Sequence, residues 1–145
     1  MARETGQSYV VRTRDANLPV KVRVTAAAQG YVSGEAFSAP LTVAKMSSKT
    51  TATVSARKIT PRDRAVIYAF VEMVGFDADL GKVTVTDGKK VISNTALKVN
   101  GDGHLTIRLK KLKLGKHKLV VSYTGSAATV ASQAKPLVVK VVRAP

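Results

Sequence analysis

The feature that most constrains this chain is the alternation of apolar and polar residues with a period of two. Such alternation is typical of β-strands with one packed and one solvated face, and helical periodicity is nearly absent. Asp87-Gly88 and residues 100–103 (NGDG) supply the turn residues that tight reversals need. The pattern therefore predicts an all-β chain. The alternating segments are residues 20–25 (VKVRVT), 82–86 (KVTVT), 104–110 (HLTIRLK) and 118–123 (KLVVSY).

From about residue 49 onward, short strands and turns alternate at the spacing of an antiparallel two-sheet sandwich. A chain of 145 residues can bury such a core, since about two-thirds of its unfolded surface is hidden on folding. We expect seven strands, at residues 50–56, 65–73, 82–87, 90–98, 104–110, 117–124 and 136–142. The residues expected to face a shared interior about 10 Å thick are Val54, Ile67, Ala69, Val71, Val83, Val85, Leu105, Ile107, Leu109, Leu119, Val121, Tyr123, Leu137, Val139 and Val141.

The second of these strands carries aromatic residues on the face opposite to its predicted core residues. Tyr68 and Phe70 point outward in this register and lie about 7 Å apart along the strand. Beside Arg108 or Lys110 they could stack a sugar ring or contact a neighbouring domain. Two alternatives stay open: residues 8–44 or a loop cover them, or the register is shifted by one residue, which exchanges the two faces.

The sequence also contains an internal echo. Residues 38–43 (SAPLTV) are echoed by residues 134–139 (AKPLVV), and Pro40 and Pro136 are 96 positions apart. That separation is the length of one sandwich domain. A stretch of about 40 residues cannot build a two-sheet core alone. We therefore expect residues 1–44 to be the C-terminal strands of a preceding β repeat and residues 45–145 to be a complete domain.

Three motifs follow one another in the second half of the chain, at residues 81–88 (GKVTVTDG), 112–119 (LKLGKHKL) and 121–125 (VSYTG). With residues 50–55 (TTATVS) and 134–141 (AKPLVVKV), they resemble the bacterial immunoglobulin-like repeat domain found in strings on secreted and cell-surface proteins. The resemblance implies an immunoglobulin-like sandwich over about residues 50–142, with no catalytic residues and no cofactor. Residues 9–43 resemble the end of a related surface repeat.

The resemblance also implies roles for two residues. His117 occupies a corner position of the family and is expected to hydrogen-bond the turn rather than to bind a metal. Tyr123 is expected to pack in the core with its hydroxyl on a backbone partner, as corner tyrosines of such sandwiches do. The chain departs from the family in charge: members are usually rich in Thr, Ser and Gly, whereas here the outward positions are lysines.

Positive charge is concentrated in the predicted complete domain. Residues 1–44 hold 5 basic and 3 acidic residues, whereas residues 45–145 hold 19 and 6, a net charge of +13. The densest stretch is residues 108–118, and its basic side chains are expected to converge on one end of the sandwich. They are Arg108, Lys110, Lys111, Lys113, Lys116 and Lys118.

Two interpretations of this basic cluster are open. In the first, it binds a polyanion such as teichoic acid, an acidic polysaccharide or anionic lipid head groups, which relieves the repulsion between the cations. In the second, it is a solvated surface whose lysine stems cover apolar strands and discourage aggregation. Nucleic acid is disfavoured, because no recognition helix, zinc-finger spacing or aromatic RNA-binding signature accompanies the charge. Six phosphate contacts would weaken binding about a thousandfold between about 50 and 200 mM salt.

The composition argues against several classes of site. There is no Cys, and with two His and six carboxylates after residue 44 most hydrolytic and metal chemistry lacks its usual groups, so we expect no enzyme. Residues 77–79 (DAD) and 100–103 lack the spacing of a calcium site. Asn94 and Asn100 could form a Lys-Asn bond, but no core position is clearly Lys or acid. No apolar run approaches the roughly 18 residues of a transmembrane helix.

These observations favour a non-catalytic spacer or adhesion module of a multidomain bacterial extracellular protein. Its expected partners are neighbouring repeats of the same chain and an anionic polysaccharide or teichoic acid. The first seven residues (MARETGQ) lack the apolar core of a signal peptide, so we expect a fragment of a longer surface protein. The main alternative is a phage or virion structural protein with a native initiator Met. A weaker alternative is a basic nucleic-acid-binding protein.

Overall fold

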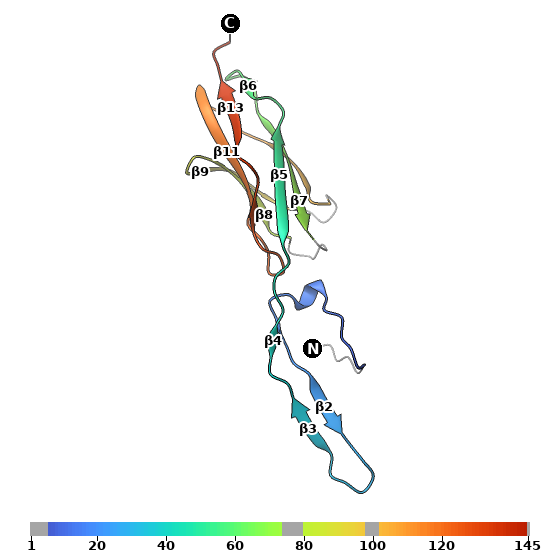
Figure 1. Cartoon of the computed structure of the whole chain (residues 1–145). Helices are drawn as coiled ribbons and strands as arrows, with labels where there is room; N and C mark the ends of the chain where they lie inside the picture. The colour runs from blue at the N-terminus through green and yellow to red at the C-terminus, as the bar shows by residue number, and fades with distance from the viewer. Residues whose placement is uncertain (1–5, 74–79, 98–101, 145) are drawn as a thin grey trace.

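The structure, a computed structural model, describes residues 6–73, 80–97 and 102–144. These residues form an elongated molecule with a two-layered β-domain at one end and a narrow N-terminal segment at the other (Figure 1). The only helical element among them is a single 3-10 turn, η1 (Thr13–Asp15). The strands are β1 (Pro19–Val20), β2 (Arg23–Ala26), β3 (Gly34–Phe37), β4 (Leu41–Thr42), β5 (Ser48–Val54), β6 (Lys58–Ile59), β7 (Val66–Met73), β8 (Lys82–Asp87), β9 (Lys90–Ala96), β10 (His104–Arg108), β11 (Gly115–Tyr123), β12 (Ser132–Gln133) and β13 (Leu137–Val141).

The domain consists of two β-sheets. The smaller has the strand order β10-β7-β5, and the larger has the order β6-β13-β11-β8-β9, with β12 beside β11. The pairs are antiparallel except for β6 and β13. Long registers, such as the one from Ser48↔Met73 to Val54↔Ile67, fix which side chains share a face. The predicted antiparallel two-sheet sandwich is confirmed.

The core lies between the two sheets and is built from alternate residues of their strands. All of the predicted inward-facing residues are buried, except that Val54, Leu105 and Leu137 are partly buried and pack against the rest. Each fully buried aliphatic side chain contributes about 1.5–3 kcal/mol to folding. The predicted inward face is therefore confirmed.

Two short strands and several strand ends differ from the prediction. The alternation does not predict β6 and β12, because a strand of two residues is too short to show it. β10 ends at Arg108 rather than at residue 110, although the backbone N–H of Leu109 still donates to the carbonyl oxygen of Ala65 (2.9 Å) and so continues the register of β10 with β7. β11 begins at Gly115 rather than at residue 117.

One prediction about the core is wrong. Tyr123 is buried, with 1% of its surface exposed, but its hydroxyl has no hydrogen-bond partner among the residues that the structure describes. Inward-facing side chains of a sandwich meet the side chains of the opposite sheet. The backbone groups of the strands are already paired with one another. The expected backbone partner of the Tyr123 hydroxyl is therefore not found.

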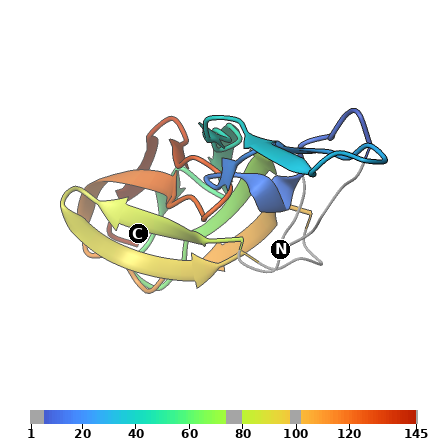
Figure 2. The same cartoon turned by 90° about the horizontal axis from the view of Figure 1, so that it is seen from below.

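The N-terminal segment is built differently from the domain. It contains two small antiparallel pairs, β1-β4 and β2-β3, and every residue from 21 to 42 is exposed. The alternation of residues 20–25 predicts one packed face, yet Val22 and Val24 are both 59% exposed. The reason is that no second layer of described residues covers this ribbon. In Figure 2 the β2-β3 hairpin projects to one side of the two sheets.

The chain enters the domain through a junction that is tied to a distant loop. The N–H of Met46 donates to the carbonyl of Ala128 (2.9 Å), and the N–H of Val130 donates to the carbonyl of Met46 (2.8 Å). The Lys45 ammonium donates to the carbonyl of Ser126 (3.0 Å). These bonds restrict rotation of the residues between the N-terminal segment and β5.

Candidate anion-binding surface

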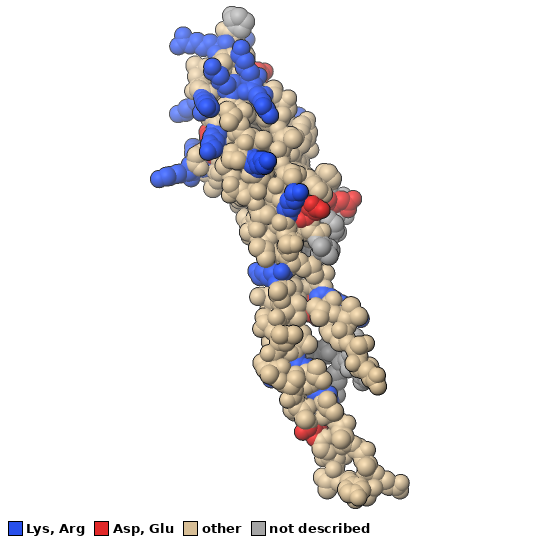
Figure 3. Space-filling model, viewed as in Figure 1, with Lys and Arg blue, Asp and Glu red and all other residues tan. Residues whose placement is uncertain are grey.

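The basic cluster predicted at residues 108–118 shares one end of the sandwich but not one face. Arg108 ends β10 in the smaller sheet, whereas Lys116 and Lys118 point outward from β11 in the larger sheet. The other three lysines lie on the loop of residues 109–114 between these strands. Lys and Arg side chains gather over this end of the molecule (Figure 3). The six cations are therefore distributed over the outer faces of both sheets and the loop between them. All six are exposed: Arg108, Lys110, Lys111, Lys113, Lys116 and Lys118.

The loop that carries three of these lysines is anchored by its neighbours. Leu109 is buried and Leu112 packs partly against the core. The carbonyl of Lys113 lies 2.8 Å from Nε2 of His117. The lysine side chains of the loop therefore extend from a backbone that is held at several points.

His117 joins this loop to β8 through a pair of hydrogen bonds. Its Nδ1 lies 2.5 Å from Oδ2 of Asp87, while its Nε2 contacts the Lys113 carbonyl. A carboxylate and a carbonyl oxygen only accept hydrogen bonds, so this arrangement favours the imidazolium, in which both ring nitrogens donate. Desolvation lowers the pKa of His117, but the hydrogen bonds to Asp87 and Lys113 and the charge of Asp87 outweigh it and raise this pKa above its ordinary value. The expected hydrogen bond from His117 to the turn is confirmed.

A row of three lysines crosses the outer face of the larger sheet. Lys58 of β6 is the register partner of Lys140 of β13, which is also the register partner of Lys116 of β11. All three are exposed, while Ile59 and Val139 beside them are buried, so the three side chains point away from the core. Adjacent strands are about 4.8 Å apart, and the row therefore spans about 10 Å. We call these residues the lysine row; Lys58 and Lys140 lie outside the predicted cluster.

The outer face of the larger sheet carries no acidic side chain in the part of the chain that the structure describes. Asp87 of β8 turns inward to His117. The remaining described carboxylates of the domain lie elsewhere: Asp63 follows β6, Glu72 is on β7 of the smaller sheet, and Asp102 precedes β10. No described carboxylate therefore neutralises the lysine row on its own face.

Tyr68 and Phe70 lie on the outer face of the smaller sheet, as the alternation predicts. Tyr68 is 51% exposed, and the ring of Phe70 stacks on His104 with centroids 4.5 Å apart. With Thr51 and Thr53 they line a shallow hollow of about 220 Å³. Because the residues on either side of them are buried, the alternative register is excluded, and the exposure of Tyr68 shows that no described residue covers it.

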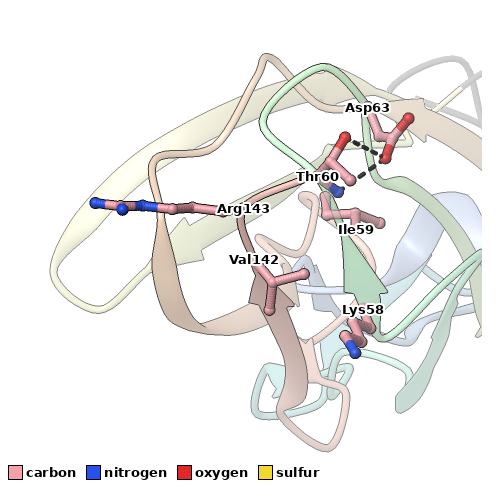
Figure 4. Close-up of a pocket in the computed structure, with 6 residues that line it drawn as sticks. All are labelled: Lys58, Ile59, Thr60, Asp63, Val142 and Arg143. Carbon is pink, nitrogen blue, oxygen red and sulfur yellow. Dashed lines mark hydrogen bonds between the residues drawn. The ribbon is translucent and has the colours of Figure 1, made fainter. Parts of the chain in front are cut away.

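A second, open hollow of about 550 Å³ lies beside the lysine row (Figure 4). Oδ2 of Asp63 accepts hydrogen bonds from the N–H and the hydroxyl of Thr60, both 2.8 Å long. These bonds hold the pKa of the Asp63 carboxyl below its ordinary range. Arg143 extends away from Asp63 in Figure 4. The partner of the Asp63 carboxylate is therefore Thr60 rather than Arg143. The hollow is lined by Lys58, Ile59, Thr60, Asp63, Val142 and Arg143.

The metal and bond-forming candidates of the sequence are only partly described by the structure. Residues 77–79 and 100–101, including Asn100, lie outside the described residues. Asp102 and Gly103 form a turn with positive φ, and Asn94 is exposed on the edge strand β9. Among the described residues, no three His, Asp or Glu side chains are grouped so that they could hold a metal ion. No helix within these residues is long and apolar enough to cross a bilayer.

Comparison with known proteins agrees with this architecture. No curated protein matches the chain. The sequence pattern of the family described as bacterial Ig-like domain (group 3) matches residues 67–142, slightly more than half of the chain. That range runs from β7 through β13 and includes the three motifs that carry the resemblance. The chain therefore belongs to the bacterial Ig-like domain (group 3) family.

Proposed function

We propose that this chain is a non-catalytic module of a bacterial extracellular protein, which separates other domains and attaches to an anionic polymer of the cell wall or matrix. In this proposal, residues 1–44 are the last strands of a preceding repeat and residues 45–145 are a complete domain. Its partners are the neighbouring repeats of the same chain and the polymer. The attachment surface is the basic end of the domain, which includes the cluster at residues 108–118.

The spacer role is supported by the junction and by the exposed N-terminal strands. The hydrogen bonds of Met46 to the loop at residues 126–130 limit bending between the two regions. An isolated two-stranded ribbon is only marginally stable in water. The exposure of Val22, Val24 and Phe37 therefore fits strands whose covering layer belongs to the rest of a repeat.

The attachment role rests on the separation of charge. The domain has a net charge of +13, against +2 for residues 1–44, and its cations gather at the end far from the N-terminal segment (Figure 3). Like charges held close together repel one another, and a polyanionic partner relieves that repulsion. Solubility alone does not require that the positive charge be concentrated at one end of the molecule.

The test is the salt-dependent binding of the full chain to purified wall teichoic acid. We expect retention at low salt and a loss of affinity of about 10²- to 10³-fold between about 50 and 200 mM salt, because about six cations release counterions. The control variant carries Arg12→Gln, Arg14→Gln and Lys21→Gln in the N-terminal segment, and it should bind within threefold of the wild type. Failure of the full chain to bind at about 50 mM salt would exclude the attachment role.

A further inference from the structure

The lysine row is unusual because three like charges are placed directly opposite one another on adjacent strands. Lys58, Lys140 and Lys116 are register partners, and Lys118 lies two residues along β11 on the same face. Like charges in such cross-strand positions destabilise a sheet. A fold that keeps them without an acidic neighbour on that face has a surface poised to receive negative charge from outside.

Protection of a sheet edge does not explain the centre of this row. Lysines at the edge of a sheet discourage pairing with other chains. Lys58 lies on the edge strand β6, and Lys116 lies on a part of β11 that the β8 pairing does not reach, since that pairing begins at Leu119. Lys140, however, lies on β13 between β6 and β11 and has no edge to protect. The carboxylate of Asp63, which lines the hollow next to Lys58, is already satisfied by Thr60.

We propose that the lysine row, together with Lys118, binds a linear phosphate-containing polymer that lies across the strands of the larger sheet. This proposal rests on the attachment role described above and specifies its site and its ligand class. The polymer runs from β6 over β13 to β11, so that successive phosphates meet Lys58, Lys140 and Lys116. The loop lysines at residues 110, 111 and 113 lie off this path and add only long-range attraction.

The chemistry of the face favours a poly(alditol phosphate), such as teichoic acid, over other polyanions. The three residues of the row are all lysines, whose ammonium groups bind phosphate as point charges without the bidentate geometry of arginine. The outward positions of β6, β13, β11, β8 and β9 that are described include no aromatic residue. Stacking on aromatic rings is the common way to hold single-stranded nucleic acids. Recognition on this face therefore relies on charge rather than on stacking.

The experiment compares two triple variants of the full chain that lose the same charge. The row variant carries Lys58→Gln, Lys140→Gln and Lys116→Gln, and the loop variant carries Lys110→Gln, Lys111→Gln and Lys113→Gln. Binding to poly(glycerol phosphate) teichoic acid is measured at several salt concentrations. We expect the row variant to lose more than tenfold in affinity, with a salt slope shallower by about 2, and the loop variant to lose less than threefold.

A second measurement shows that the row variant is folded. Because the substitutions remove cross-strand repulsion, its melting temperature without polymer should equal or exceed that of the wild type at low salt. If binding is lost while the melting temperature is not lowered, the loss is due to the removed lysines and not to unfolding.

The outcomes separate the site from the attachment role. If the full chain binds but both variants weaken equally, the charge acts diffusely and the site is wrong. If only the loop variant weakens, the site lies on the loop. Tighter binding of heparin or of poly(dT) than of teichoic acid at equal charge overturns the ligand class. No binding by the full chain overturns the site and the attachment role together.

Discussion

Residues 20–25 and strand β11 both place apolar residues at alternate positions, but their side chains meet different surroundings. Val24 is 59% exposed, whereas Val121 is fully buried. β2 and β3 pair only with each other, whereas β11 pairs with β13 and β8 and faces the smaller sheet. The comparison shows that alternation specifies a strand, while burial requires a second layer to close over it.

The same two regions differ in charge. The domain, which supplies its own core, holds most of the excess positive charge, and the N-terminal segment is nearly neutral. In the domain, the stabilising free energy of the buried core offsets the repulsion between surface lysines. The ribbon has no such core, because every residue from 21 to 42 is exposed.

Truncation of a side chain should show the largest difference in stability effect between the two regions. Leu119 is fully buried, and Leu119→Ala should lower the free energy of unfolding by about 2–5 kcal/mol through lost burial and a cavity. Val24→Ala in the exposed ribbon should change it by less than about 0.5 kcal/mol. Urea unfolding followed by circular dichroism measures both. Equal effects of the two substitutions would mean that the ribbon shares the core.

Two glycines with similar backbone conformation, one in each region, should respond differently to substitution by alanine. Gly81 and Gly30 both have positive φ, 75° and 84°. A Cβ at Gly81 would lie 2.2 Å from the carbonyl oxygen of Gly125, whereas a Cβ at Gly30 meets nothing within 4 Å. Gly81→Ala should therefore cost about 3 kcal/mol, from backbone strain and the clash together. Gly30→Ala should leave the unfolding of the domain unchanged in the same urea titration.

The His117–Asp87 pair predicts a pH dependence confined to the domain. The pKa of His117 is raised in the folded state, so the pair stabilises the fold fully below the unfolded pKa of about 6.5 and loses this contribution as the pH rises through the folded value. Asp87→Asn should lower the free energy of unfolding by about 1.5 kcal/mol at pH 6 and by less at pH 9.

His104→Gln is the matched control, since it removes the other histidine of the chain and should keep the pH dependence. Unfolding titrations across this pH range, with NMR titration of the His117 ring, measure the effect. A wild-type stability that does not fall as the pH rises past the folded pKa would rule out the ion pair.

The smallest expected effect comes from reversing one charge in the lysine row. Lys140→Glu places an acid between Lys58 and Lys116 and should stabilise the domain by about 0.5 kcal/mol at low salt. Salt should reduce the gain, because it screens exposed charges. Lys21→Glu in the N-terminal segment should have no effect. Melting temperatures at low and high salt provide the comparison, and a destabilised Lys140→Glu variant would show that the row does not repel.

The sequence is sufficient to predict the longer strands and the inward faces of the domain, because a period of two is a local property. It does not reveal the lysine row, since Lys58 and Lys140 are 82 positions apart and β6 is only two residues long. The pairing of Asp87 with His117 joins residues 30 positions apart and depends on strand register. Likewise, the alternation of the sequence continues to Lys110, although β10 ends at Arg108.

Amide hydrogen exchange on the full chain tests the contrast between the two regions most directly. If the domain alone has a closed core, the amides of β7, β8 and β11 should exchange only through global unfolding, whereas those of β2 and β3 should exchange orders of magnitude faster. Protection of the β2-β3 amides equal to that of β11 would contradict the account, as would rapid exchange throughout β11.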